Sequence, residues 1–370
     1  MNQFQLVVAL FFTGIAQMAM ADSPLTFTLT SYHPGELSLR CEERLSRARD
    51  LGFQAVTLTP AFLVDEAGER LVPRSEQPVA PGEIAACLAR ADKMGIAVVY
   101  KPHLEHRATL QGSHEHVWRA NFKIKPDSDL IETVFGDWSA WASRPIGGEI
   151  GSPTTWVVLA AELEKSIALY SDRWLEALTL LKLSVVQAER PIRFGINLNW
   201  ESIFALDAGQ CASFSELLGK SDFLAFSLYG DFRRARKHST RFEAALQAGV
   251  RGLYDRGQPA GCDWASGGSV QLPVPKLAIG EFGVGGNLRR SYSDVPAPWW
   301  RRGRWVKNRR ALFKTFFGWR EDKGDALEFT SLWTIGVFDP FGIHEFEQPS
   351  RILDPALTFS LRTRRWRPPS

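Results

Sequence analysis

The sequence predicts a (β/α)8 barrel that follows a signal peptide. The chain of 370 residues is long enough for one large α/β domain, and eight short, β-branched apolar runs alternate with longer amphipathic stretches. Eight parallel strands, each followed by a helix, are what this barrel requires. A doubly wound sheet shows the same alternation. However, the first strand is not followed by a glycine-rich phosphate loop, and "GEFGVGG" at 280–286 leads into a loop instead of a helix.

The first 21 residues form the expected signal peptide. They carry no charged side chain, have an apolar centre and end in "AMA" before Asp22, the A-x-A pattern of a cleavage site. An uncleaved anchor is disfavoured, because the apolar run is too short to span a membrane and is broken by Gln17. No later segment is long and apolar enough to span one. We therefore expect the barrel to be residues 22–370 of a bacterial protein exported to the periplasm or beyond.

The strands are expected in buried runs with turn residues at their ends. We place them at 25–31, 55–60, 97–103, 156–162, 193–200, 223–229, 276–283 and 329–336. Apolar residues at helical spacing predict helices at 41–52, 81–95, 171–187, 239–249 and 306–321. Long loops are expected at 104–155, 230–275 and 284–305, where they would build the active-site face.

Charge and cysteine content limit the function classes. The chain has 44 Lys and Arg residues and 41 Asp and Glu residues. The resulting net charge of +3 is too small to indicate a nucleic-acid-binding surface. The basic stretches at 301–310 and 362–370 are typical of solvated faces, although they could also hold the protein near anionic polysaccharide or phospholipid. The four cysteines allow three disulfide pairings after export, of which Cys41 with Cys87 and Cys211 with Cys262 join sequence neighbours. Buried free thiols are an equal alternative, and the cysteine spacing fits no zinc motif.

Two glutamates mark the ends of expected strands. Glu162 follows the apolar run "WVVLAA" and Glu281 lies late in "KLAIGEFG". In a barrel such strand ends converge on the catalytic face, and two carboxylates across one barrel mouth suit the hydrolysis of glycosidic bonds. A separation of about 5 to 5.5 Å between the carboxyl groups would make one of them a nucleophile and retain the anomeric configuration. Alternatively, either acid could simply pair with a neighbouring Arg or Lys.

The motifs at these strands resemble those of the retaining (β/α)8 glycoside hydrolases, and most closely glycoside hydrolase family 113, whose characterised members are endo-β-1,4-mannanases. The resemblance covers about 32–345 and is carried, in order, by "GFQAVTLTP", "GIAVVYKPHLE", "LAAELEKS", "FGINLNWES", "SDFLAFSLYGDF", "PKLAIGEFGVGG" and "FTSLWTIGVFDPFG".

The resemblance implies roles for particular residues. Glu162 would be the acid/base and Glu281 the nucleophile, and the subsite at the cleavage point would be lined by Lys101, His103, Asn199, Trp200, Tyr229 and Trp333. Trp333 offers a face on which a sugar ring can stack, and Tyr229 can bond the nucleophile; as core aromatics, Trp200 and Trp333 would need no such role. Ala161 is a departure, since these enzymes usually place before the acid/base an Asn that bonds the sugar 2-hydroxyl.

The third loop gathers imidazoles and carboxylates: His103, His106, His114, His116, Glu105 and Glu115. Such groups could hold a divalent cation. No H-E-x-x-H spacing is present, and polar histidines over a sugar cleft explain the cluster equally well. We therefore expect no metal and no cofactor.

The sequence thus predicts an exported retaining glycoside hydrolase that acts on a β-linked polysaccharide or oligosaccharide, of β-mannan type if the resemblance holds. The residues leave open the sugar, its linkage and exo or endo action. A non-hydrolytic glycan-binding barrel in polysaccharide assembly or export is the alternative, which Ala161 favours and the paired glutamates oppose.

Overall fold

The computed structural model describes residues 23–50, 53, 55–107, 118–145, 153–199, 207–230, 275–284, 316–318, 320 and 327–333. Within them, eight parallel strands close into a barrel, because β1 pairs with β2 on one side and with β9 on the other. These strands are β1 (Leu25–Ser31), β2 (Ala55–Val64), β3 (Ala97–Tyr100), β5 (Thr155–Ala161), β6 (Ile192–Asn199), β7 (Phe223–Gly230), β8 (Lys276–Val284) and β9 (Leu327–Leu332). The closed barrel confirms the predicted fold class and excludes the open, doubly wound sheet.

A short strand extends the barrel wall beyond its third strand. β4 (His103–His106) follows β3 after a break at Lys101 and Pro102, and it pairs with the second half of β2, Ala61–Val64. The predicted strand 55–60 is therefore too short, because β2 continues to Val64. Since side chains alternate along a strand, His103 and Glu105 share one face of this extension.

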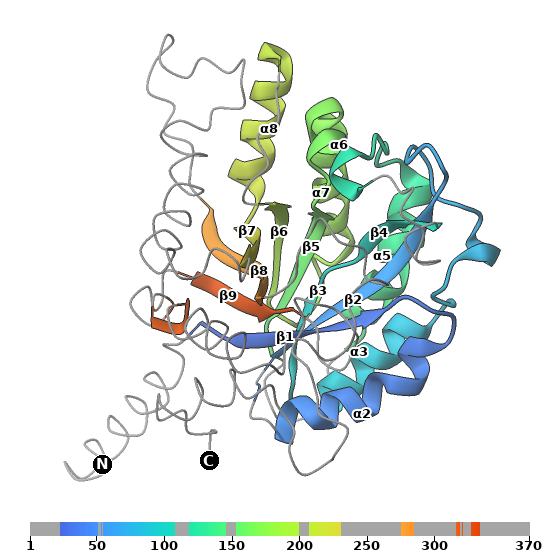
Figure 1. Ribbon diagram of the computed structural model, residues 1–370, viewed down its shortest axis with the longest axis vertical. Coiled ribbons are helices and arrows are strands. Elements are labelled where there is room, and N and C mark those ends of the chain that lie inside the picture. The colour runs from blue at the N-terminus through green and yellow to red at the C-terminus, as the bar shows by residue number, and fades with distance from the viewer. Residues whose placement is uncertain are drawn as a thin grey trace.

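Helices lie outside the barrel (Figure 1). The longer ones are α2 (Glu36–Asp50), α3 (Glu83–Lys93), α5 (Ser128–Ala142), α7 (Ser171–Ser184) and α8 (Ala208–Lys220). The shorter ones are α6 (Glu164–Leu169) and the 3-10 turns η1 (Arg74–Glu76) and η2 (Arg119–Asn121). The predicted helices at 41–52, 81–95 and 171–187 correspond to α2, α3 and α7. The helix predicted at 239–249 lies outside the described residues, and of 306–321 only Phe316–Gly318 and Arg320 are described, as helix.

Helix α5 corrects the prediction of one long loop over 104–155. Its first turn is capped by Asp127, whose side chain accepts a hydrogen bond from the Leu130 N–H. Its buried side chains recur at helical spacing and include Val134, Trp138 and Trp141. Gly136 and the aromatic residues lower the intrinsic helix propensity of this segment, so its stability comes from packing.

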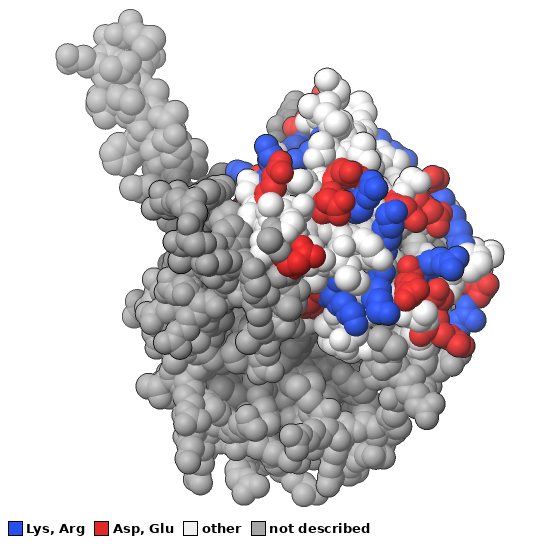
Figure 2. Space-filling view, turned by 90° about the horizontal axis from the view of Figure 1, so that it is seen from above, with Lys and Arg blue, Asp and Glu red and all other residues white. Residues whose placement is uncertain are grey.

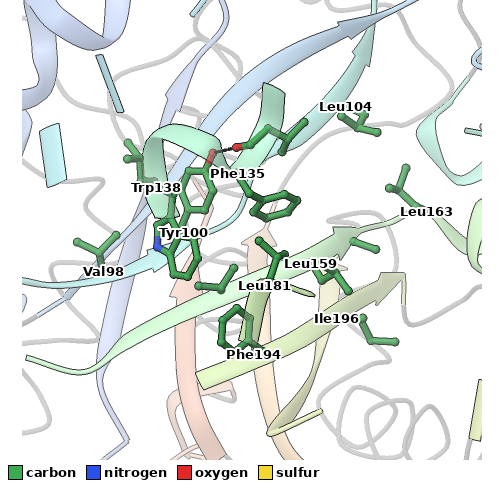
Figure 3. Packing of buried hydrophobic residues seen from close by; sticks show 14 of the residues in the cluster. Val98, Tyr100, Leu104, Phe135, Trp138, Leu159, Leu163, Leu181, Phe194 and Ile196 are labelled. Carbon is green, nitrogen blue, oxygen red and sulfur yellow. Dashed lines mark hydrogen bonds between the residues drawn. The ribbon is translucent and has the colours of Figure 1, made fainter. Parts of the chain in front are cut away.

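The core has an outer and an inner part. The outer part lies between barrel and helices, where Tyr100 stacks on Trp138 and its hydroxyl donates to the Val134 carbonyl at 2.5 Å (Figure 3). The inner cluster consists of Val99, Trp156, Val158, Ala161, Phe223, Ala225, Ala278 and Phe329. These residues alternate along their strands with those of the outer part, so they fill the barrel. Above this cluster, polar side chains fill the interior of the barrel and form the candidate site.

A disulfide ties α2 to α3 through Cys41 and Cys87, with Cα atoms 5.8 Å apart. This confirms one of the two predicted pairings. Cys211 is also disulfide-bonded, but its predicted partner Cys262 lies outside the described residues. The buried free-thiol alternative is therefore wrong for Cys41, Cys87 and Cys211.

We expect the double substitution Cys41→Ala and Cys87→Ala to lower the free energy of unfolding by about 3 to 4 kcal/mol. The bridge closes a segment with a sequence separation of 46, and releasing it increases the entropy of the unfolded chain. Chemical denaturation of the variant and the parent under non-reducing conditions measures the difference. An unchanged midpoint and slope would contradict the expectation.

The described surface carries charges of both signs. Lys and Arg side chains are interspersed with Asp and Glu over the described part of the face that Figure 2 shows. Within the described ranges, no helix has the length and apolar character needed to cross a bilayer.

Candidate active site

Glu162 stands where β5 ends, as the sequence predicts. Among the described residues it is the one non-glycine residue with positive φ, 56°, a conformation that costs free energy and concentrates at functional sites. The β5–β6 pairing shifts register between Val158 and Ala161, and the Glu162 N–H donates to the Asn197 carbonyl at 2.7 Å. This irregular backbone places the Glu162 side chain inside the mouth of the barrel, 1% exposed.

Glu281 comes from β8 and is equally buried, at 1% exposure. The Lys101 ammonium, itself fully buried, donates to Glu281 Oε1 and, at 3.1 Å, to the Gly280 carbonyl. Burial lowers the pKa of Lys101, and the carboxylates of Glu281 and Glu162 oppose that effect. Lys101, which the resemblance implied only as a lining residue of the subsite, therefore lies against the predicted nucleophile.

Gly280 leaves room for a side chain from β6. A Cβ built at this position would lie 1.6 Å from Asn197 Oδ1, so any other residue would displace the Asn197 amide. Asn197 is fully buried and its Nδ2 donates to Ser227 Oγ at 2.8 Å. The Ser227 hydroxyl also forms a hydrogen bond with the Glu162 side chain, which lowers the pKa of that carboxyl. Gly280, Asn197 and Ser227 thus hold the predicted acid/base in place.

We expect Gly280→Ala to lower stability by about 2 kcal/mol or more and to reduce activity, because the added methyl overpacks a filled site. Thermal unfolding and turnover should both fall. A matched control is Gly136→Ala on α5, where the nearest atom would be a Glu132 carbon at an ordinary 3.8 Å. Equal stability of the two variants would show that the Asn197 amide is not confined as described.

His103 lies between the predicted nucleophile, Glu281, and a third carboxylate, Glu105. Its Nε2 lies 3.1 Å from Glu281 Oε1 and its Nδ1 lies 3.6 Å from Glu105 Oε1. Burial first, and then the charge of Arg119, holds the pKa of His103 well below its ordinary value, so the imidazole is neutral. The ring stacks on Trp333 with centroids 5.9 Å apart. One face of the predicted sugar platform, Trp333, is therefore covered by His103.

The remaining predicted residues are placed to different degrees. The Asn199 N–H donates to Glu164 Oε1 at 2.6 Å, and its amide Nδ2 is buried without a hydrogen-bond partner among the described residues. Tyr229 is part of strand β7, but the structure describes only its backbone and not its side chain. Trp200 lies outside the described residues altogether.

Arg119 is a residue of the candidate site that the sequence did not indicate, and Glu105 was considered only as a possible metal ligand. Arg119 belongs to η2, which packs against β4 and α6. Its Nη2 lies 2.6 Å from Glu105 Oε1 and its Nε lies 3.7 Å from Glu162 Oε2. Although burial alone would lower the pKa of Arg119, the carboxylates of Glu105 and Glu162 raise it, so the guanidinium stays charged. The signal for Glu105 was its two-residue spacing from His103; no local signal marked Arg119.

The pKa of Glu162 is raised, first by burial and second by the charge of Glu281. Arg119, Lys101 and the Ser227 hydrogen bond oppose this shift without cancelling it. A raised pKa keeps a carboxyl protonated closer to neutral pH, which is what a proton donor needs. The two glutamates therefore have unlike environments, one with a raised pKa and one held by a lysine.

The predicted histidine loop is only partly described. His106 Nε2 lies 3.2 Å from the Glu66 carbonyl, so this imidazole is turned away from the one at position 103. His114, Glu115 and His116 lie outside the described residues. Within the described part of the chain, no group of three or more His, Cys, Asp or Glu side chains is arranged to hold a metal ion.

The chain matches no protein-family model and no curated protein sequence. Solved structures do match its fold. The glycoside hydrolase family 113 β-mannanase of Alicyclobacillus acidocaldarius is 16% identical, with a TM-score of 0.52 over 93% of this chain and 97% of that one. An exo-β-1,4-mannosidase of Opitutaceae bacterium strain TAV5 is 10% identical, with a TM-score of 0.52 over 92% of this chain and 59% of that one. The predicted resemblance to (β/α)8 glycoside hydrolases is confirmed at the level of the fold.

Proposed function

We propose that this chain, which has the fold of the (β/α)8 glycoside hydrolases, is a retaining glycoside hydrolase that cleaves a β-linked polysaccharide or oligosaccharide. The observation that carries the proposal is a pair of buried carboxylates that interact electrostatically: Glu162, which directly follows β5, and Glu281, which lies in β8. Retaining enzymes use two such groups with unlike protonation states.

In the proposed reaction, Glu281 attacks the anomeric carbon while Glu162 gives its proton to the leaving glycosidic oxygen. This step leaves a glycosyl ester on Glu281 and a charged Glu162. In the second step Glu162 removes a proton from water, the water oxygen bonds to the anomeric carbon, and Glu281 leaves as a carboxylate. Lys101 stabilises the negative charge on Glu281 before and after the reaction, and the neutral imidazole of His103 lies beside the same oxygen.

A β-mannan-type substrate is the finer proposal. It is supported by the activities of the two proteins of similar structure, a β-mannanase and an exo-β-1,4-mannosidase. Ala161 removes the usual donor to the sugar 2-hydroxyl. Asn199 Nδ2, which has no hydrogen-bond partner among the described residues, is a donor that replaces it in this proposal. A hydrogen bond of this kind contributes to rate when it strengthens in the transition state.

The release of reducing ends from β-mannan, glucomannan, β-glucan and β-galactan tests the proposal. We expect one of these polymers to be cleaved by the parent chain and none by Glu162→Gln or Glu281→Gln. Equal activity in the parent and both variants would reject the two assignments.

A second candidate function is non-hydrolytic glycan binding in polysaccharide assembly or export. The observation that favours it is Ala161 at the position where the related enzymes carry their hydroxyl-binding Asn. If none of the four polymers is hydrolysed but the folded chain binds one of them, this function would be selected. The fold alone serves either role.

We also propose that the chain is exported after cleavage between Ala21 and Asp22. The Cys41–Cys87 disulfide supports this, since such bonds persist in oxidising compartments. N-terminal sequencing of the protein recovered from a bacterial periplasm or medium should begin at Asp22. A mature chain that begins at Met1 would reject the leader.

A further inference from the structure

A series of contacts runs from one proposed catalytic carboxylate to the other. Glu281 touches His103, His103 faces Glu105, Glu105 binds Arg119, and Arg119 lies against Glu162. All five side chains are at most 6% exposed. Charges so far from water interact strongly, so a change at one of them is felt by the others.

Arg119 is placed to act on one carboxylate while being held by another. Its tighter contact is with Glu105, 2.6 Å away, and its looser contact is with Glu162, 3.7 Å away. The Nε and Nη1 atoms are buried without a hydrogen-bond partner among the described residues. A buried guanidinium normally uses its donors, and the Nε donor is the one that faces Glu162, 3.7 Å from its Oε2.

We propose that Arg119, anchored by Glu105, is a positioning residue that stabilises the ionised form of Glu162, the form that must act as the base in the second step of the reaction. The inference rests on the proposed function. It deepens that function by naming the group that controls the shared proton, and it assigns the third loop a role in turnover.

The physical reason is the change of charge at Glu281. In the free enzyme the charge of Glu281 favours the protonated form of Glu162, whereas the cations of Arg119 and Lys101 favour its ionised form. Glu164 on α6 is a further buried carboxyl, and its Oε1 accepts a hydrogen bond from the Asn199 N–H. Once Glu281 is esterified its charge is gone, so the two cations act on Glu162 without that opposition and Glu162 gives up its proton more easily, which is what the second step requires.

The groups that face Glu162 come from several elements. Glu281 on β8 favours its protonated form, whereas Arg119 on η2, Lys101 at the β3–β4 break and the Ser227 hydroxyl on β7 favour its ionised form. His103 is neutral and contributes little charge. Lys101 is bound directly to Glu281 and Arg119 to Glu105, and of these two cations Arg119 is the one that also forms an ion pair with Glu162.

The test compares two charge changes of opposite sign in the full chain. Arg119→Met removes the cation and is expected to move the alkaline limb of the kcat/KM profile to higher pH. It should also slow the second step, so that azide, which needs no base, raises kcat about tenfold or more. Glu105→Gln leaves Arg119 less compensated and is expected to move the same limb to lower pH. Arg119→Lys keeps the charge, so the alkaline limb of its kcat/KM profile should stay near that of the parent.

The matched control is Arg107→Gln. Arg107 lies one residue beyond β4, pairs with Glu76 and has a side chain that is 48% exposed. Removing the same charge there should leave the limb in place and give no azide effect. Thermal unfolding of every variant separates a shifted profile from a damaged fold.

A readout without turnover keeps the inference separate from the proposed function. The protein labelled with ¹³C at the glutamate carboxyl carbon gives a Glu162 resonance, identified by its loss in Glu162→Gln, whose titration can be followed by NMR. Folded Arg119→Met and Glu105→Gln proteins with the parent titration would overturn the inference even if glycans are hydrolysed. Shifts of opposite sign in a protein that hydrolyses no glycan would uphold the control of Glu162 and reject the proposed function.

Discussion

Glu281→Gln is expected to lower kcat by about 10⁴-fold or more, a loss of about 5.5 kcal/mol of transition-state stabilisation. The amide has nearly the shape of the carboxylate, but it is a poor nucleophile and cannot form the glycosyl ester. The substitution also leaves the buried Lys101 ammonium without its carboxylate, so some loss of stability should accompany it. Turnover of the polymer cleaved by the parent, measured below the unfolding temperature of the variant, checks the expectation.

A carboxylate at the other end of the barrel supplies the control. Glu328, near the start of β9, accepts a hydrogen bond from Trp156 Nε1 at 2.8 Å and pairs with Lys276. Glu328→Gln also removes a charge from the barrel but should retain turnover. If Glu281→Gln kept more than about one hundredth of the parent kcat, the nucleophile would have to be another group.

The barrel strands were predictable because parallel strands are buried on both faces and form nearly continuous apolar runs. β1 agrees with its predicted range, and β8 with its range to within one residue. The continuation of β2 to Val64 was not predictable in this way. It depends on β4, whose pairing with β2 is set by the break at Lys101 and Pro102 and not by a local pattern. Helix α5 had a usable signal in its Asp127 cap, although Gly136 weakened the helical pattern.

The site was predictable where strand ends bring residues together. Glu162, Glu281, Lys101 and His103 meet because their strands are neighbours or face one another across the barrel mouth. Arg119 could not be found this way, since a three-residue 3-10 turn has no period and its place is fixed by packing against β4 and α6. Polar residues within apolar runs were the overlooked signal for Asn197 and Ser227.

The second large effect is expected at Glu162→Ala. Polymer hydrolysis should fall by about 10³-fold or more, because the leaving sugar oxygen needs a proton. An aryl glycoside whose phenol leaves without protonation should lose far less in the first step. Its turnover is then limited by the second step, which azide can accelerate because it attacks without a general base.

The pH dependence of kcat/KM tests the direction of the Glu162 pKa shift, which the choice of substrate alone does not test. The pKa of Glu162 is raised by burial and by the charge of Glu281, so the parent keeps its proton donor to a higher pH than an ordinary glutamate would. Its kcat/KM on polymer should therefore fall only above that raised value, and the fall should be absent from the profile of Glu162→Ala on the aryl glycoside. The matched control is Lys165→Ala, which removes an exposed cation on α6 and should keep the parent profile. If the alkaline limb survived in Glu162→Ala, the titrating acid would be a different group, and Arg119 would have to be assigned to that group instead.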